Sequence, residues 1–452
     1  MYAPHTDSDV RAMLDVIGEP SLEALSAPPP GLEIRQSLGL APPMAESDAY
    51  TFLRSLASAN QASTMPCFLG AGAYRHYIPP AVPWFATRSE FLTAYTPYQA
   101  EASQGSLQAI YEWQTYICLL TGLDVSNASV YDGATALLEG VIMAANATGR
   151  RRVAVSRAVH PLYRAVLSTY AAGMGIQIDE LEFDVAGVTV QPGELPSGSQ
   201  APAAVVIQSP NFFGCVEDMK PWSRLSKNCG ALSIQVIAEA LSLAVLKSPG
   251  ESGVDVAVGE AQSLGLPLGY GGPYCGFVAA TKEHVRRLPG RLVGETTDVD
   301  GRRAYVLTLQ GREQHIRREL ATSNICTNQA LCALIVTVYL ATVGAKGLRA
   351  IAVSNLKRAR QLAEALREVE GISIRSTSAF FNEFVVDLPL PAADVADSLQ
   401  RRGILAGLPL SRFYPQLPAS LLVCATELTS ASDIRRLSQA LAEESRHAVA
   451  AV

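Results

Sequence analysis

The stretch GVDVAVGEAQSLGLPLGYGGPYCGF, residues 253–277, has a buried-strand pattern followed by polar residues and a glycine-rich turn. Polar side chains at the end of a buried strand, beside a glycine turn, are where open α/β enzymes commonly hold their ligands. This stretch supplies Glu260, Gln262 and Ser263, but no lysine, no histidine and no reactive cysteine. The sequence therefore predicts a segment with the layout of a site and without a reactive group.

Length and composition limit the class of protein that must position this segment. The chain has 452 residues, of which 48% are hydrophobic and 17% charged, which is typical of a globular protein with more than one domain. The net charge of -6 offers no basic surface, so we expect neither a nucleic-acid partner nor a membrane partner. The eight cysteines form no CxxC pair and have no zinc-ligand spacing, so we expect no metal site.

Two further patterns bear on localisation. The N-terminal MYAPHTDSDVRAML lacks a basic region followed by an apolar core, which argues against a signal peptide. The longest apolar run, LCALIVTVYLATVG, is shorter than a membrane-spanning helix needs and favours a buried helix. Most cysteines lie in apolar surroundings, as expected of reduced thiols. We expect a cytoplasmic protein.

The order of predicted elements indicates three regions: an N-terminal helical segment (1–64), a large α/β domain (65–345) and a small C-terminal α+β domain (346–452). In the large domain, β-branched runs alternate with helical ones, which predicts a mostly parallel sheet covered by helices. The predicted strands are RRVAVS, IQIDELEF, AAVVIQS, ALSIQVIAEA, VDVAVG and GFVAAT. These proportions suit type I pyridoxal-phosphate enzymes, although other α/β enzymes share them.

Pyridoxal phosphate (PLP) makes three demands, which the sequence meets poorly. Its phosphate suits a helix N-terminus such as the one predicted after Asp132 and Gly133, although a plain cap would look the same. Its ring nitrogen needs an acid, and Glu239 has the right charge but a longer side chain than aspartate. Its Schiff base needs a lysine at a strand end. The six lysines all look like surface residues: Lys220, Lys227, Lys247, Lys282, Lys346 and Lys357.

Several long motifs resemble one family. They are FLGAGAYRHYIPPAV, AYTPYQAEASQGSLQAIYEWQT, GLDVSNASVYDGATA, IQSPNFFGCVED, GEAQSLGLPLGYGGPYCGF, GREQHIRRELATSNICTNQAL and LLVCATEL. Together they extend from about residue 65 to 430 and resemble the N-terminal half of glycine decarboxylase, the P-protein of the glycine cleavage system. In many bacteria that half is a separate chain.

The resemblance implies a type I PLP-dependent transferase-like fold and a division of labour. The catalytic lysine belongs to the other half, subunit 2, where an aspartate is followed eight residues later by the lysine. Here Asp255 is followed eight residues later by Ser263, so this chain resembles the degenerate half. The implied complex decarboxylates glycine with PLP bound covalently by subunit 2, and passes the aminomethyl group to the lipoylated H-protein. The family also implies an (αβ)₂ heterotetramer.

In type I dimers, loops of one protomer complete the other's pocket, and the resemblance therefore suggests shared-interface residues. The arginine and histidine of the first group would orient a carboxylate or tune proton transfer, the tyrosines would line a dry pocket, and the threonine would reach the partner-bound phosphate. Packing within an interface is the alternative for each of them. The candidates are Arg75, His76, Tyr77, Tyr95, Pro97, Tyr98, Gly271, Gly272, Ser323, Asn324 and Thr327.

One departure from the family pattern affects this expectation. The family run REKATSN has a lysine where this chain has Leu320, so any anion contact of that lysine would fall to Arg317 or Arg318. Two other functions remain open from the sequence. One is a stand-alone PLP lyase or desulfurase that uses an unrecognised lysine, and the other is a binding or scaffold protein without decarboxylase activity.

Overall fold

The computed structural model describes residues 5–29, 31–32, 39–62, 64–92, 95–376 and 378–450, with side chains to residue 446. The chain divides into two compact units, residues 1–63 and 64–452. In the first unit, α1 (Asp7–Ile17) begins with a capping box in which Thr6 and Asp9 bond each other's backbone N–H. The helices α2 (Leu22–Leu25) and α3 (Glu46–Ala59) follow, confirming the helices expected there.

A seven-stranded sheet forms the centre of the second unit, in the order β1-β7-β6-β5-β4-β2-β3. The strands β2 to β6 run parallel to one another, whereas β7 pairs antiparallel with both β6 and β1. All six strands expected in the large domain are present as β2 to β7, and the two-residue β1 was not predicted. The strands are β1 (Val125–Ser126), β2 (Arg152–Ser156), β3 (Gln177–Leu181), β4 (Ala204–Gln208), β5 (Leu232–Ile237), β6 (Val256–Glu260) and β7 (Gly276–Ala280).

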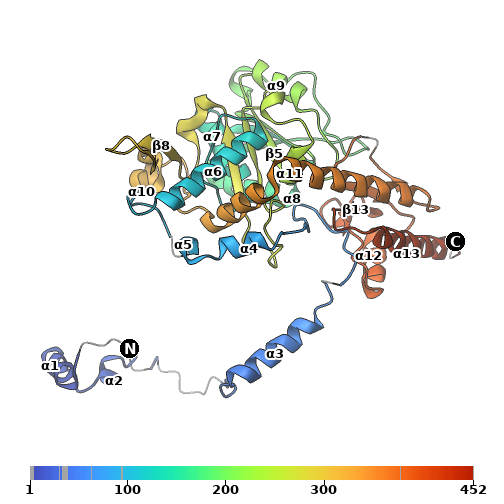
Figure 1. Cartoon of the computed structure of the whole chain (residues 1–452). Coiled ribbons are helices and arrows are strands. Elements are labelled where there is room, and N and C mark those ends of the chain that lie inside the picture. The colour runs from blue at the N-terminus through green and yellow to red at the C-terminus, as the bar shows by residue number, and fades with distance from the viewer. Residues whose placement is uncertain are drawn as a thin grey trace. The chain divides into compact units, whose positions relative to one another are not determined.

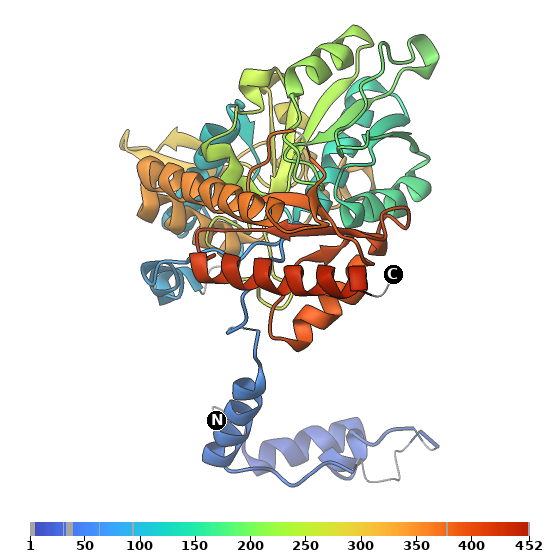
Figure 2. The ribbon, with the colours of Figure 1, turned by 90° about the vertical axis from the view of Figure 1, so that its right-hand side faces the viewer.

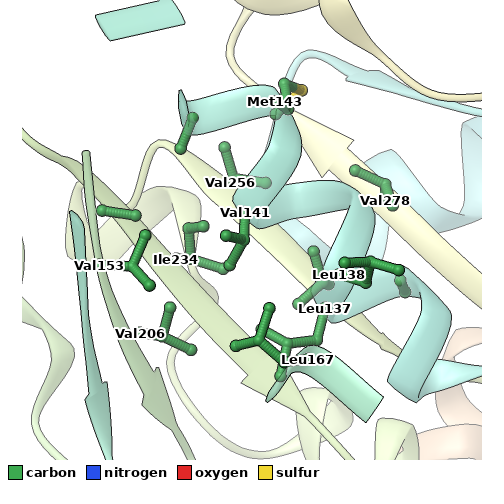
Figure 3. Close-up of a cluster of buried hydrophobic side chains, with 14 of the residues drawn as sticks. Leu137, Leu138, Val141, Met143, Val153, Leu167, Val206, Ile234, Val256 and Val278 are labelled. Atoms are coloured by element: carbon green, nitrogen blue, oxygen red, sulfur yellow. The ribbon is translucent and has the colours of Figure 1, made fainter. Parts of the chain in front are cut away.

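The sheet is covered on both faces, which explains why its central strands β4, β5 and β6 are buried at every position. On one face, α7 (Gly133–Thr148) lays Leu137, Leu138 and Val141 across side chains of β2 to β7, and α8 (Pro161–Met174) adds Leu167 (Figure 3). On the other face lie α6 (Gln104–Thr121), α9 (Met219–Asn228) and the first part of α11 (Ala330–Arg367). Burial on both faces requires β-branched and small residues throughout.

The long helix α11 joins this sheet to a second one. It has non-helical dihedrals at Gly344 (φ 60°, ψ 176°), so it is kinked there, at the predicted domain boundary. By length and composition alone α11 could cross a membrane, but Tyr339 and other residues of its apolar part pack in the protein core. We propose that the kink separates the large domain, 65–345, from the small one, 346–452.

The second sheet has four antiparallel strands in the order β10-β11-β13-β12. They are β10 (Ser373–Ile374), β11 (Glu383–Asp387), β12 (Leu408–Pro409) and β13 (Ser420–Cys424). The C-terminal part of α11 packs on this sheet with α12 (Ala392–Arg401) and α13 (Ala431–Ala450), as Figures 1 and 2 show. These elements confirm the α+β pattern expected of the C-terminal region, in which the two-residue β12 was not predicted.

Other elements differ from expectation or border the site. The segment KEHVRRL forms a 3₁₀ helix, Lys282–Arg287, after β7. The hairpin of β8 (Val293–Thr297) and β9 (Arg303–Leu307) was not expected, because its exposed Thr and Arg residues lack an apolar pattern. The short helices α4 (Ala81–Ala86), α5 (Ser89–Leu92) and α10 (Gln314–Arg317) lie in the long loops.

Candidate functional site

Glu239, Glu260 and Ser263 lie at or just after the carboxyl ends of two adjacent parallel strands. Glu239 follows β5, whereas Glu260 ends β6 and Ser263 lies in the turn after it. Because β5 and β6 are parallel neighbours, their carboxyl ends meet at one edge of the sheet. The loop of residues 70–78 reaches the same edge, where the backbone N–H of Tyr74 donates to Gln262 at 2.8 Å.

Glu239 contacts a histidine of that loop. The side chain of His76 is only 3% exposed, and its two ring nitrogens lie 3.2 Å from Glu239 and 2.9 Å from Glu427. Burial lowers the pKa of His76, but the charge of Glu239 and hydrogen bonds to both acids outweigh burial and raise the pKa to about 10. His76 is therefore a buried imidazolium held between two carboxylates.

Two amides complete this group, which we call the His76 cluster: His76, Glu239, Glu427, Asn355 and Asn382. The amide of Asn382 donates to Glu239 at 3.0 Å, and that of Asn355 donates to Glu427 at 2.8 Å. The cluster thus joins the 70–78 loop, the end of β5, the helix α11 and the small sheet. Glu239, the acid that a PLP ring nitrogen would require, instead holds these elements together through His76 and Asn382.

A second buried acid fastens the same loop to the small sheet. Glu383 of β11 accepts hydrogen bonds from the backbone N–H of Ala71 at 2.6 Å and the hydroxyl of Tyr74 at 2.7 Å. Burial raises the pKa of Glu383 to about 7, although these two donors lower it. Loop 70–78 is consequently fixed along its length by polar contacts to both sheets.

Ser263 cannot supply a Schiff base, and no other described residue near it can. Its side chain is 1% exposed, and its hydroxyl accepts a hydrogen bond from the backbone N–H of Leu241 at 3.3 Å. All six lysines of the chain are exposed, so none of them lies in a buried pocket. This argues against the stand-alone PLP lyase or desulfurase.

The N-terminus of α7, expected as a phosphate cradle, is occupied by the protein itself. Asp132 caps the helix and accepts from the N–H of Thr135, while the carboxylate of Glu260 accepts from the N–H of Gly133 at 3.0 Å. Burial raises the pKa of Glu260 to about 7, against the lowering effect of its N–H donors, chiefly Cys275 and Gly133. With Ser263 in place of a lysine, the residues here do not fit PLP.

A second group of candidate residues surrounds an apolar surface hollow of about 80 Å³. Tyr95 and Pro97 contribute from the loop after α5, and Ala330 and Leu331 contribute from the start of α11. Tyr95 is 80% exposed, whereas Pro97 is buried. The structure therefore brings the 95–98 loop against the start of α11, which follows Thr327.

The buried side chain of Arg291 connects this loop to the 323–328 segment. Its side chain is fully buried, and it donates to the hydroxyl of Tyr98 at 3.3 Å and to the amide oxygen of Asn328 at 3.2 Å. Asn328 in turn donates to the backbone carbonyl of Ala128 at 2.7 Å. The ring of His315 packs edge-on against Tyr98. Ser323 is partly buried, Asn324 is exposed and Thr327 is partly buried.

The remaining candidates lie in turns. Gly271 and Gly272 have φ values of 108° and 136°, which only glycine adopts readily, and they follow the fully exposed Tyr270. Gln262 links this turn to loop 70–78, because it bonds both Tyr74 and the carbonyl of Leu266. Arg75 and Tyr77 are exposed, and Arg75 forms no ion pair with any described residue. The interface role of all these residues stays a prediction.

Sequence reasoning missed the residues that hold the site together. Arg291, Glu427 and Glu383 stand in unremarkable local sequence, and their side-chain partners lie 37 or more residues away along the chain, so no local pattern marks them. Glu260 was singled out from the sequence, because it is a charged residue at the end of an otherwise apolar strand, but its contact with Gly133 was not predicted. Within the described parts of the chain, no group of three or more His, Cys, Asp or Glu side chains could hold a metal ion.

Comparison with known proteins decides which family this geometry represents. The family model described as "Glycine cleavage system P-protein" matches residues 1–441. The chain belongs to the glycine cleavage system P-protein family. A relative from Moorella thermoacetica, named "Probable glycine dehydrogenase (decarboxylating) subunit 1", is 48% identical over 97% of this chain and 98% of its own length. A relative of the same name from Phenylobacterium zucineum is 47% identical, covering 98% and 99%.

Solved structures agree with this membership. A crystal structure of glycine decarboxylase (P-protein) of the glycine cleavage system, in inhibitor-bound form, is 46% identical, with a TM-score of 0.89 over 98% of this chain and 99% of that one. More distant is the Lactobacillus brevis glutamate decarboxylase, with a TM-score of 0.66 and 14% identity over 91% and 95% of the chains. The P-protein fold seen here is thus the α/β fold of type I PLP-dependent enzymes.

Proposed function

We propose that this chain is the non-lysine-bearing subunit of glycine dehydrogenase (decarboxylating), the glycine decarboxylase of the glycine cleavage system. The names of its full-length relatives support this role. The observation that carries the assignment of a non-lysine-bearing role is the set of six exposed lysines, together with Ser263 where a Schiff-base lysine would stand. A chain of this fold without a buried lysine needs a partner to supply one.

In the proposed complex, subunit 2 binds PLP covalently, and this chain completes the pocket. PLP held there would supply an electron sink for the loss of CO₂ from glycine. The aminomethyl group then passes to the lipoylated H-protein. We further propose an (αβ)₂ assembly in the cytoplasm.

This chain contributes positioned loops to the shared pocket. The exposed Arg75 guanidinium is free to bind a carboxylate such as that of glycine. The neighbouring His76 is buried and acts as a positioning residue, because its two ring nitrogens are already engaged by Glu239 and Glu427. Tyr95 lines the hollow and, with the neighbouring Tyr98, would exclude water from the shared pocket, and Thr327 would contact the partner-bound phosphate.

Leu320 marks the one departure from the family motif. It is 71% exposed, so it neither stabilises the core nor offers a charge to an anion. The adjacent Arg317 and Arg318 are also exposed and retain positive charge in the same short segment. We propose that they supply the anion contact that the missing lysine would make.

Reconstitution with a separately purified subunit 2 tests the proposed function. The two chains should co-purify, and their mixture with PLP and lipoylated H-protein should exchange labelled CO₂ with the carboxyl group of glycine. Each chain alone should show no exchange. Absence of exchange in the mixture, with both chains folded, would contradict the proposal. A PLP absorbance band in this chain alone would favour the stand-alone enzyme.

A further inference from the structure

The N-terminus of α7 is closed by a glutamate from the neighbouring strand. Glu260 is 1% exposed, and its two carboxylate oxygens receive three backbone hydrogen bonds. One oxygen accepts from Gly133 at 3.0 Å, and the other accepts from Gln262 at 3.0 Å and Cys275 at 2.9 Å. Convergent N–H groups at a helix N-terminus are the arrangement that binds phosphate in other proteins. Here an internal carboxylate takes them.

The charge at this helix end is also unfavourable for an external anion. Asp132, the N-cap residue, accepts from the N–H of Thr135 at 2.7 Å. Together with Glu260 it places two carboxyl groups at the end of one helix, where the positive end of the helix dipole favours negative charge. A phosphate approaching the same N–H groups would meet like charges and would find Gly133 already bonded.

Side chains occupy the remaining space. A Cβ atom added to Gly133 would lie only 2.4 Å from the hydroxyl oxygen of Tyr163 and 3.0 Å from the Cβ of Glu260. Tyr163 is buried and is stacked on the ring of His160, with ring centroids 4.6 Å apart. His160 is held in turn by a contact of 2.8 Å to the carbonyl oxygen of Ala71. With the Glu260 side chain in place, the packing leaves no room for a phosphate group beside Gly133.

We infer that Glu260 acts as a built-in anion that replaces a cofactor phosphate at the N-terminus of α7, so that this chain excludes phosphate-bearing ligands from its own pocket. The absence of a lysine prevents a covalent bond, and Glu260 additionally prevents non-covalent binding. The inference concerns this chain alone and does not depend on the activity of the proposed complex.

Phosphate binding by the full-length chain tests the inference. Inorganic phosphate and pyridoxamine 5′-phosphate, which lacks an aldehyde and cannot react with surface lysines, are titrated by calorimetry and by their effect on the melting temperature. The wild-type chain should show no saturable binding of either. Glu260→Ala, which frees the N–H groups of Gly133, Gln262 and Cys275, should bind phosphate at least tenfold more tightly than wild type.

Glu139→Ala is the matched control, because it removes a buried carboxyl group from the middle of the same helix, where the N–H groups are already bonded within the helix. It should gain no phosphate affinity. Equal phosphate affinity in wild type and Glu260→Ala would overturn the inference, and so would an equal gain in both alanine variants.

A second variant decides the question if Glu260→Ala does not fold. Glu260→Gln fills the same volume, but its NH₂ group cannot accept the N–H of Gly133, so it should melt at a lower temperature than wild type and gain no phosphate affinity. A melting temperature equal to or above that of wild type would show that the carboxylate does not serve the helix end, and would overturn the inference.

Discussion

At the residue scale, the His76 cluster shows how a position suited to cofactor chemistry is used for structure. Glu239 stands where an acid would face a cofactor ring, yet its carboxylate is bonded by His76, Asn382 and the N–H of Leu241. A buried carboxylate is tolerable only when it is paired and hydrogen-bonded. Glu239 is both, which leaves it no free oxygen for a cofactor ring.

Removing the imidazolium should be costly, because it leaves Glu239 and Glu427 buried without their cation. We expect His76→Ala to lower the free energy of unfolding by about 3–5 kcal/mol, as for other broken buried ion pairs. Urea denaturation of the isolated chain at pH 7 measures this loss. His315→Gln is the control. His315 is more exposed than His76 and lies 3.7 Å from Glu313, its single acidic neighbour, which is a longer contact than either contact of His76. This substitution should lower the free energy of unfolding by at most about 1 kcal/mol.

The same cluster predicts a pH dependence. The pKa of His76 in the fold is about 10, above the ordinary value of 6.5. Its protonated form therefore stabilises the fold fully below pH 6.5, and this contribution declines as the pH rises and is lost above about 10. Between pH 7 and 10 the free energy of unfolding, measured by urea denaturation, should fall more in wild type than in His76→Gln. Equal losses in the two proteins would place the titrating group elsewhere.

At the element scale, the kink in α11 decides how one helix serves two sheets. Before Gly344 the helix packs against the large sheet through residues such as Val336 and Tyr339. After it, Leu348 and Ala352 still pack in the same core, and Leu362 and Leu366 further along pack against the small sheet. The dihedrals at Gly344 lie in a region that residues with a Cβ rarely adopt. Glycine at this position permits the change of direction.

We expect Gly344→Ala to destabilise the chain by about 1–3 kcal/mol, because alanine must either adopt these dihedrals or straighten the helix. Gly173→Ala is a matched control in the last turn of α8, where the glycine is helical and nothing lies within 4 Å of the added methyl group. That change should stabilise the chain by up to about 1 kcal/mol. Urea midpoints of the two variants provide the comparison, and a neutral Gly344→Ala would contradict this role of the kink.

At the scale of the whole molecule, exposed apolar side chains gather around the hollow between α5, α6 and α11. Tyr95, Leu92 and Leu331 line it, and all three are exposed in the isolated chain. Clustered exposed aromatic and aliphatic residues are typical of surfaces that bind another protein. This surface therefore suits the proposed contact with subunit 2.

A charge in this hollow should weaken the complex without unfolding the chain. We expect Leu331→Glu or Tyr95→Asp to lower the affinity for subunit 2 at least tenfold, because either places a carboxylate in a desolvated contact. Val185→Asp, a change of another highly exposed residue that lies outside the hollow, should leave the affinity unchanged. Size-exclusion chromatography or calorimetry of the mixed subunits measures the effect. Unchanged affinity with both hollow variants would move the interface elsewhere.

Local patterns accounted for most elements of the fold and fewer of the contacts at the site. The strands β2 and β4 to β7 are continuous apolar runs between glycine and proline signals, so each could be predicted from its own residues. The hairpin β8–β9 could not, because its strands are largely polar and exposed. Distant pairs such as His76 with Glu427 leave no periodic trace in the chain.

The sequence by itself determined that the segment 253–277 has no lysine at its strand end, because chemical identity does not depend on folding. It also determined the buried strands β2 and β4 to β7, whose apolar residues mark them in the sequence. Only the tertiary structure decided what Glu239 and Glu260 do. Their carboxylates act through partners brought near by the sheet, the helix α7 and the loop 70–78, and burial makes each partner necessary.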